Sequence, residues 1–284
     1  MPDGSAAAAG TMRLGGDLTV ARLGFGAMRL TGPGIWGDPP DREAAKRLLR
    51  RAVELGVTFI DTADAYGPGV SETLIAEALR PYPAGLVIAT KGGLTRPGPG
   101  HWRPDGRPSH LRAACEASLR RLNVDRLDLY QLHAPDPRVA YEESVGALVQ
   151  LRADGKIRHI GLANVSIQQL QMVQPLTPIV SVQNRYSIHD RGSEAVLAHC
   201  TREGIAFIPR ALLVPNPTPA GEAVSALATR HGVTVAQLVL AWALDRSPAM
   251  LPIPGTSSIG HLEDNLAAAS VHLSPTEVTA LTAL

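Results

Sequence analysis

Cysteine is scarce in this sequence of 284 residues, and its scarcity excludes a fold that is held together by disulfides. Its two cysteines, Cys115 and Cys200, lie in separate helix-like stretches and have no metal-ligand spacing. Small secreted domains depend on several disulfides, whereas a chain of this length can bury a sizeable apolar core. We therefore expect a protein of the reducing cytoplasm.

A block of positive charge and a long apolar run are also missing. The 27 Lys and Arg residues are scattered and nearly balance the 26 Asp and Glu residues, so the formal net charge is +1. This balance argues against a nucleic-acid or anionic-membrane surface and favours a small-molecule partner. No run approaches the roughly 18 apolar residues of a membrane-spanning helix. The opening MPDGSAAAAG lacks the basic and apolar parts of a signal peptide, so we expect a disordered tail over residues 1–10.

Short apolar runs alternate with longer amphipathic segments along most of the chain. Strands buried on both faces are apolar almost throughout, so these runs predict a parallel sheet with helices between its strands. Eight such strands predict an α/β fold of the (β/α)8 TIM barrel type, with a single domain over residues 11–284. An open doubly wound sheet is the alternative, but no Gly-rich dinucleotide fingerprint follows the first strand. The predicted strands are 23–28, 57–61, 86–91, 127–133, 157–164, 179–183, 205–209 and 250–254.

Helix and turn signals separate these strands. A helix is predicted over residues 41–56, with Asp41 as its N-cap and Gly56 as its stop. Capping-box patterns predict three later helix starts, and Pro275 suits a first helical position. The segment 11–24 predicts a small N-terminal β-hairpin that caps the bottom of the barrel. The capping-box pairs are Ser166 with Gln169, Thr234 with Gln237, and Ser274 with Glu277, and the hairpin turn is placed at Gly15 and Gly16.

Five successive strands each end in a polar residue, and in a TIM barrel the chemistry lies at those ends. Taken singly, each residue has an ordinary explanation: a helix cap, a solvated lysine or a satisfied structural histidine. Because parallel strands deliver their ends to one rim, the five together favour a functional site. They are Asp61, Lys91, His133, Asn164 and Gln183.

A tyrosine, Tyr66, follows Asp61 by five residues, and this set of side chains suits proton transfer to a carbonyl oxygen. A free phenol is a poor acid at neutral pH, and a nearby ammonium group lowers its pKa. Lys91 can supply that ammonium group, and Asp61 can keep the lysine charged. We therefore expect Tyr66, with its pKa lowered towards the operating pH, to act as general acid, and His133 to orient the substrate oxygen.

Several segments resemble the signature segments of the aldo-keto reductase family, in order and over nearly the whole chain. They are GVTFIDTADAYG, VIATKGG, DLYQLHAPD, GKIRHIGLANVS and IPGTSSIGHLEDN, and RLGFGAMRLTGPGIWGDPPDR is most similar to the bacterial pyridoxal reductase-like members. The resemblance implies a (β/α)8 fold and a nicotinamide cofactor without a Rossmann domain. It also implies a catalytic tetrad of Asp61, Tyr66, Lys91 and His133.

The same resemblance implies the cofactor site. The nicotinamide carboxamide would lie against Asn164 and Gln183, although Ala163 replaces a serine of many members. The segment that begins at Gly255 would bind phosphate, and backbone N–H groups at a helix start suit that task; a tight connection that needs Gly255 only for its turn is the alternative. The implied contacts are Thr256, Ser257 and His261 around the ribose phosphate, and Asp264 and Asn265 at adenine. Because Gly255 and His261 replace a Lys and an Arg of many members, NADP is expected by family habit and NAD is the alternative.

Arg210 departs from the family pattern, because an aromatic residue usually stacks on the nicotinamide ring at this position. Three interpretations stay open: a stacking guanidinium, an anion-binding guanidinium, or a side chain turned to solvent.

Long loops, at 92–108 and at the Pro-rich 212–221, suit lids over a pocket. Trp36 and Trp102 lie in the loops after the first and third predicted strands and are expected to form walls for a flat carbonyl substrate, with loop anchoring as the alternative. The chain ends soon after its last predicted helix, so we expect an open pocket. Three basic residues, Arg29, Arg96 and Arg103, could add charge near this pocket, but basic loop residues are usually solvated, and we expect the same here. The nine histidines lack the clustering of a metal site.

Three functions follow from these residues. The leading hypothesis is an NADPH-dependent reductase of aldehydes or ketones, acting as a monomer or weak homo-oligomer. A binding protein of the same fold, with little turnover, is the second. A cofactor-free enzyme that forms a Schiff base on Lys91 is the third, although Asp61 would keep that lysine protonated and less nucleophilic.

Overall fold

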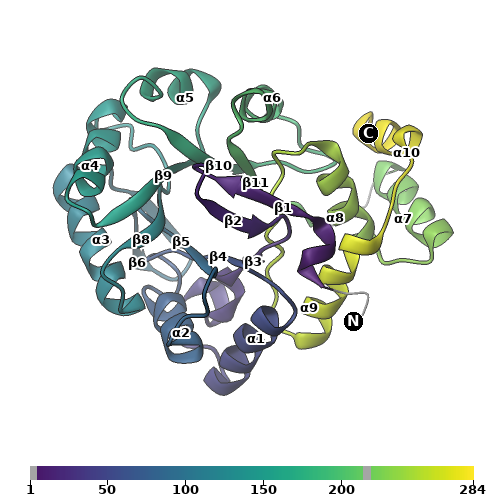
Figure 1. Ribbon diagram of the computed structural model, residues 1–284, viewed down its shortest axis with the longest axis horizontal. Helices are drawn as coiled ribbons and strands as arrows, with labels where there is room; N and C mark the ends of the chain where they lie inside the picture. Colours follow the sequence, from purple (N-terminus) through teal and green to yellow (C-terminus); the bar gives the residue numbers. More distant parts are fainter. Residues whose placement is uncertain (1–4, 214–218) are drawn as a thin grey trace.

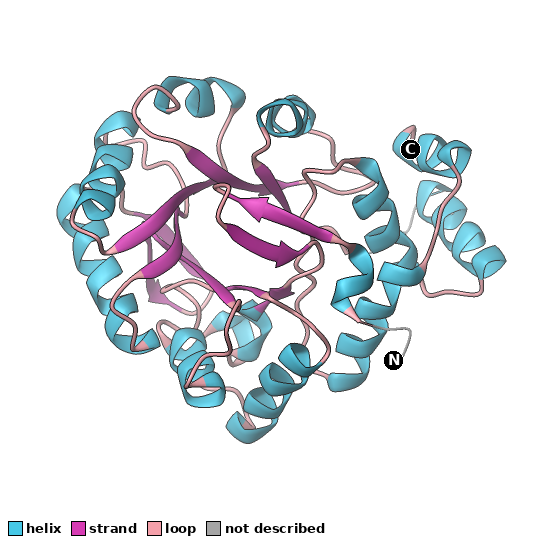
Figure 2. Ribbon diagram, in the orientation of Figure 1, coloured by secondary structure: helices cyan, strands magenta, loops and turns pink. Residues whose placement is uncertain are grey.

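A curled parallel sheet forms the centre of the protein, and helices surround it (Figures 1 and 2). The computed structural model describes residues 5–213 and 219–284. Seven strands pair in the order β11-β10-β9-β8-β5-β4-β3, and every pair is parallel. They are β3 (Phe25–Gly26), β4 (Phe59–Asp61), β5 (Val87–Gly92), β8 (Leu127–Leu132), β9 (Ile157–Ala163), β10 (Ile179–Arg185) and β11 (Ala206–Arg210).

The eighth predicted strand, 250–254, lies in the expected place but is not a regular strand. On one side, Pro252 O accepts a hydrogen bond from Gly24 N (2.9 Å). On the other side, Leu251 N donates to Phe207 O (2.9 Å). The segment therefore closes the barrel between β3 and β11. Pro252 and Pro254 have no N–H group, and this explains why no continuous ladder forms here.

Helices connect the strands and cover the outside of the sheet (Figure 1). The main helices are α1 (Arg42–Glu54), α2 (Val70–Leu79), α3 (Pro108–Leu122), α4 (Tyr141–Ala153), α5 (Ile167–Val173), α6 (Glu194–Glu203), α7 (Pro219–His231), α8 (Val235–Arg246), α9 (Ile259–Ala267) and α10 (Pro275–Thr282). Short 3-10 helices are η1 (Ala6–Ala9), η2 (Ala27–Leu30), η3 (Pro33–Ile35) and η4 (Ala268–Ser270). The three predicted capping boxes are all present, at the starts of α5, α8 and α10. Asp41 caps α1 by accepting a hydrogen bond from Ala44 N.

An antiparallel hairpin of β1 (Thr11–Leu14) and β2 (Leu18–Ala21) precedes the barrel. Its turn residues Gly15 and Gly16 have φ of +59° and +83°, as the sequence predicts for a tight hairpin. Leu14, Leu18 and Val20 pack inside the barrel against residues at the beginnings of the strands, among them Phe59, Val87 and Ala206. The hairpin thus closes the end of the barrel opposite the strands' carboxyl ends, which confirms the prediction (Figure 1).

The predicted tail and one predicted loop differ from expectation. Residues 5–10 are ordered instead of forming part of a disordered tail, because Ser5 caps η1 and Ala6 N donates to Leu55 O (3.0 Å) at the end of α1, which buries Ala6 fully. The loop at 92–108 contains an antiparallel hairpin of β6 (Leu94–Gly98) and β7 (His101–Pro104), which Gly100 turns at a φ of +73°. Residues 214–218 of the Pro-rich loop at 212–221 lie outside the described residues.

Among residues 5–213 and 219–284, no single helix is both long and apolar enough to cross a membrane. Helices Ala220–His231 and Val235–Arg246 pass that test together by length and composition only, with a 94° bend between them.

Candidate active site

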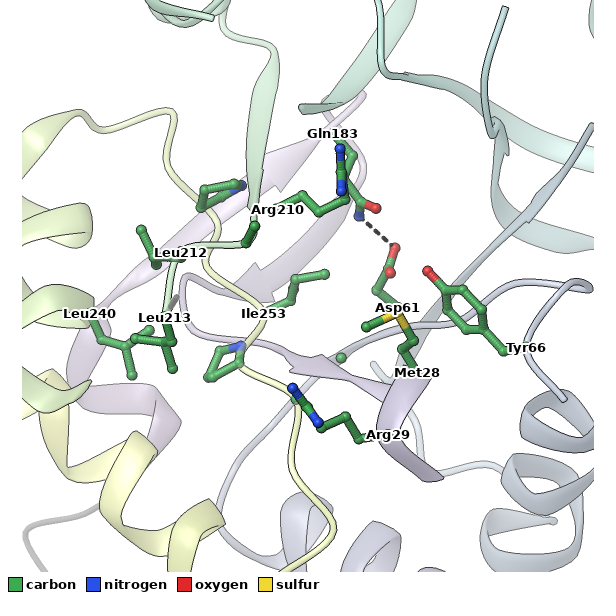
Figure 3. A pocket seen from close by; sticks show the side chains of 15 residues that line it. Met28, Arg29, Asp61, Tyr66, Gln183, Arg210, Leu212, Leu213, Leu240 and Ile253 are labelled. Atoms are coloured by element: carbon green, nitrogen blue, oxygen red, sulfur yellow. Dashed lines mark hydrogen bonds between the residues drawn. The ribbon is translucent and has the colours of Figure 1, made fainter. Parts of the chain in front are cut away.

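The polar residues at the strand ends meet at the carboxyl end of the barrel. Asp61 ends β4, Lys91 lies near the end of β5, and His133 follows β8. Asn164 follows β9 and Gln183 lies near the end of β10. A cavity of about 200 Å³ opens beside them. Figure 3 shows Asp61 and Tyr66 on one side of this cavity and Leu212, Leu213 and Leu240 on the other.

Asp61 and Lys91 form a buried ion pair below Tyr66. Lys91 Nζ donates to Asp61 Oδ2 at 2.5 Å and to the carbonyl oxygen of Thr62 at 2.8 Å. The lysine is fully buried and Asp61 is 2% exposed. Burial lowers the pKa of Lys91, but Asp61 and Tyr66 more than offset this effect and raise it above its ordinary value. Lys91 is therefore an ammonium group at neutral pH.

Gln131 also contacts Asp61, and the sequence analysis missed it. Its Nε2 donates to Asp61 Oδ1 at 3.0 Å, and Gln183 Nε2 donates to the same oxygen at 3.1 Å. With Lys91 on the other oxygen, both oxygens of the carboxylate are paired, and this arrangement favours the charged form. A signal for Gln131 existed: it is two residues before His133 in the same strand-like run, so both side chains share one face of the sheet.

Tyr66 lies in the connection after β4, with its ring centroid 5.2 Å from Lys91 Nζ. Burial raises the pKa of Tyr66 above its ordinary value, while the positive charge of Lys91 acts in the opposite direction. The expectation of a lowered pKa is therefore wrong for this state of the protein, because the desolvation of the phenolate outweighs the ammonium group. Tyr66 keeps its proton at neutral pH and remains able to donate it.

His133 and Trp102 complete a cluster of rings around Tyr66. The ring centroid of Tyr66 is 5.9 Å from that of His133 and 6.4 Å from that of Trp102, and all three pairs meet edge to face. Burial, together with the charges of Lys91 and Arg210, holds the pKa of His133 well below its ordinary value. A neutral imidazole follows, with Nδ1 unpartnered among the described residues. Trp36 lies further out, beside Arg96.

Asn164 links three strand ends. Its Nδ2 donates to His133 O at 2.8 Å and its backbone N donates to Gln183 O at 2.9 Å. Its φ of +58° is a left-handed conformation that asparagine tolerates better than most residues. Arg210, which ends β11, is exposed and donates from Nη2 to Asn164 Oδ1 at 3.2 Å. The Arg210 guanidinium thus holds the oxygen of the Asn164 amide.

A second cavity, of about 370 Å³, continues from the first, and Leu213 and Gly255 line both. The sequence analysis named Gly255, Thr256, His261, Asp264 and Asn265 for this region, and all five line this cavity, together with Thr234 and Ala236 at the start of α8. Ser257 is exposed beside it, whereas Thr256 Oγ1 accepts a hydrogen bond from Ser258 N (3.0 Å) and so stabilises the turn before α9. Arg29, one of the three basic loop residues named for charge near the pocket, lines the first cavity.

Comparison with known proteins assigns this chain to a family. The model of the Aldo/keto reductase family matches residues 22–284. An uncharacterized oxidoreductase of Schizosaccharomyces pombe is 47% identical over 270 residues, which cover 95% of this chain and 88% of that protein. Pyridoxine 4-dehydrogenase of Escherichia coli is 41% identical over 266 residues, which cover 91% of this chain and 93% of that protein.

A solved structure agrees with these relatives. An aldo/keto reductase from Klebsiella pneumoniae in complex with NADP and acetate is similar to this chain with a TM-score of 0.78 and 29% identity, over 95% of this chain and 93% of that one.

Proposed function

Since this chain belongs to the aldo/keto reductase family, we propose that it reduces an aldehyde or ketone with NADPH, and that Tyr66 is the general acid. The observation that carries this proposal is the position of Tyr66 at the cavity, beside the buried pair of Lys91 and Asp61. A protonated phenol next to a fixed ammonium group can release its proton to a substrate oxygen, because the ammonium stabilises the phenolate that remains.

Each member of the tetrad then has a separate task. Tyr66 donates the proton, and Lys91 stabilises the resulting phenolate. Asp61 keeps Lys91 charged and in place through the 2.5 Å ion pair. His133, which is neutral in this surrounding, is available to hydrogen-bond the carbonyl oxygen and hold it near the Tyr66 hydroxyl.

The described residues fit a bound nicotinamide cofactor. The amide of Gln183 lines the first cavity and the start of α9 lines the second, and these suit a carboxamide and a phosphate respectively. We assign Asn164, Gln183 and Arg210 to the nicotinamide end. The other end is assigned to Gly255, Thr256, Ser257 and His261 around phosphate, and to Asp264 and Asn265 at adenine. When bound, NADPH supplies the hydride for the carbonyl carbon. The Klebsiella pneumoniae complex supports NADP over NAD.

The remaining assignments are coarser. Trp36 and Trp102 are proposed to contribute to the substrate side of the site. We propose a single domain over residues 11–284, a monomer or weak homo-oligomer, and a cytoplasmic location, which the two free, buried cysteines support.

A single kinetic comparison tests the function. Purified protein is mixed with NADPH and a panel of aromatic and aliphatic aldehydes that includes pyridoxal, since one relative is a pyridoxine 4-dehydrogenase, and nicotinamide absorbance is followed. Tyr66→Phe should lower kcat by about 10²- to 10⁴-fold, the usual contribution of a general acid. Tyr141→Phe is the matched control, because the Tyr141 hydroxyl is buried at the start of α4 without a hydrogen-bond partner among the described residues.

The outcomes separate the alternatives. Turnover lost in Tyr66→Phe and kept in Tyr141→Phe supports the mechanism. Equal turnover in Tyr66→Phe and the unaltered protein would refute Tyr66 as the acid. Tight NADPH binding without reduction of any carbonyl would replace the reductase by a cofactor-binding protein.

A further inference from the structure

Arg96 lies on β6, in the hairpin above the barrel rim. The sequence predicts a solvated side chain, but Arg96 is buried. Its side chain donates to four carbonyl oxygens. Nη1 donates to Ile35 (2.9 Å) and Ala65 (3.1 Å), Nη2 to Gly34 (3.0 Å), and Nε to His101 (3.1 Å). One guanidinium thus connects η3, the connection that carries Tyr66, and β7.

The same guanidinium lies against two indole rings. Its central carbon is 3.8 Å from the ring centroid of Trp102 and 5.5 Å from that of Trp36. Within residues 5–213 and 219–284, Arg96 forms no ion pair, so its hydrogen bonds to carbonyls and its contacts with the indoles account for its burial. A planar fork of donors that also stacks on aromatic faces is specific to arginine, and a lysine cannot reproduce it.

This cluster reaches the proposed acid through Trp102. The indole is 37% exposed, and its centroid is 6.4 Å from those of Tyr66 and of His133. An indole held in one orientation beside the reacting hydroxyl offers a rigid apolar surface to a substrate ring, and offset or edge-to-face contacts between aromatic rings are favourable. A small aliphatic substrate would gain little from the same surface.

We propose that Arg96 is a positioning residue that holds Trp102 and Trp36 as a preformed aromatic wall, and that this wall selects carbonyl substrates bearing a planar aromatic ring. The inference rests on the proposed function for its substrate, since Trp102 in this wall lies beside Tyr66. The backbone around Tyr66 has other restraints, among them Gly67 N to Ile35 O (3.3 Å) and Ser71 N to Tyr66 O (3.2 Å). Loss of Arg96 should therefore affect the binding of aromatic substrates more than the proton transfer itself.

The kinetic test compares Arg96→Met and Arg96→Lys with Arg103→Met on the same hairpin. Arg103 is exposed, and within residues 5–213 and 219–284 its side chain forms no hydrogen bond or ion pair, so it serves as the control. Both Arg96 variants should lower kcat/KM for an aromatic aldehyde about tenfold, mainly through KM, and that for a small aliphatic aldehyde about twofold or less. In a Trp102→Ala background, Arg96→Met should add about twofold or less, because the wall is already absent. Equal losses for both substrate classes, or fully additive losses, would overturn the proposal.

A second measurement does not depend on turnover. Quenching of tryptophan fluorescence by acrylamide should increase in Arg96→Met, because Trp36 and Trp102 are released while Trp242, which is fully buried, is not. Unchanged quenching would contradict the positioning role whether or not the protein is active. If no carbonyl is reduced but quenching increases in Arg96→Met alone, the proposed function fails and the positioning role of Arg96 stands.

Discussion

Replacing Asp61 by Asn should destabilise the protein strongly, because it removes the only carboxylate that pairs with Lys91 among the described residues. The two groups are 2% and 0% exposed, and Nζ lies 2.5 Å from Oδ2. An amide at position 61 keeps the shape and the Thr62 carbonyl oxygen still accepts from Lys91, but the buried ammonium group loses its counter-charge. Breaking a buried pair in this way costs about 3–5 kcal/mol. Urea denaturation at pH 7 should show a free energy of unfolding lower by that amount.

Lys91→Met is the matched variant. It leaves the Asp61 carboxylate with two amide donors, Gln131 and Gln183, at 3.0 and 3.1 Å. Because hydrogen bonds to a charged group contribute about 1.5–3 kcal/mol each, these donors limit the penalty, and the loss should be smaller than for Asp61→Asn. The double variant buries neither charge, so its loss should be clearly less than the sum of the two single losses.

The pH dependence gives a further check. In the folded protein the pKa of Lys91 is raised above 10.5, so the stabilisation from the pair is fully present below about pH 10.5 and is lost as the pH rises through the folded pKa. In Asp61→Asn, burial still lowers the pKa of Lys91 while the charge of Asp61 no longer raises it, so this pKa should fall. The free energy of unfolding of the Asp61→Asn variant should then rise towards that of the unaltered protein between about pH 7 and pH 10, because the buried lysine loses its charge before the unfolded lysine does. Equal urea midpoints at pH 7, or additive losses in the double variant, would refute this account of the site.

Two further experiments test the closure of the barrel and the state of the thiols. In Gly255→Ala, the added Cβ would lie 2.8 Å from Gly26 O, where backbone meets backbone, so urea denaturation should show a loss of about 1–3 kcal/mol; Gly260→Ala in α9, whose nearest atom is at 3.8 Å, should instead be neutral or stabilising. Burial raises the pKa of Cys115 and of Cys200 to about 12. Neither thiol should react with a disulfide reagent at pH 7 in the folded protein, and both should react in urea; rapid reaction without denaturant would contradict their burial.

Local signals in the sequence predict much of the fold. The capping pairs at Ser166, Thr234 and Ser274 form as predicted because they involve residues only three positions apart. The hairpin at Gly15 and Gly16 follows from backbone freedom at the turn. The meeting of the polar strand ends follows from parallel pairing alone, since parallel strands bring their carboxyl ends to one rim.

Features that depend on distant partners could not be predicted in the same way. In the sequence, Arg96 looks like a solvated loop residue. Two of its acceptors are backbone carbonyls at Ile35 and Ala65, and the residues next to Arg96 in the sequence do not reveal that these carbonyls lie nearby. The irregular last strand is a different case, because Pro252 and Pro254 are visible in the sequence and neither can donate to a strand ladder; the apolar pattern alone is too weak a reason to predict a regular strand there. The raised pKa of Tyr66 depends on how completely the fold buries the phenol, which the identity of its neighbours does not reveal.

Gln183 donates to Asp61 and is also proposed to contact a nicotinamide carboxamide, and Gln131 makes these two contacts compatible. Both amides donate to the same oxygen of Asp61, at 3.0 and 3.1 Å, and Ser181 Oγ donates to Gln131 Oε1 at 3.4 Å. Gln131 lies fully buried, further from the rim, and is held by Asp61 and Ser181. If Gln183 turns towards a nicotinamide carboxamide, Oδ1 still has one donor and Oδ2 still has Lys91, so the turn leaves no carboxylate oxygen unpaired. Gln183 can therefore leave Asp61 for the proposed cofactor contact, because Gln131 keeps Asp61 hydrogen-bonded while Asp61 holds Lys91 charged.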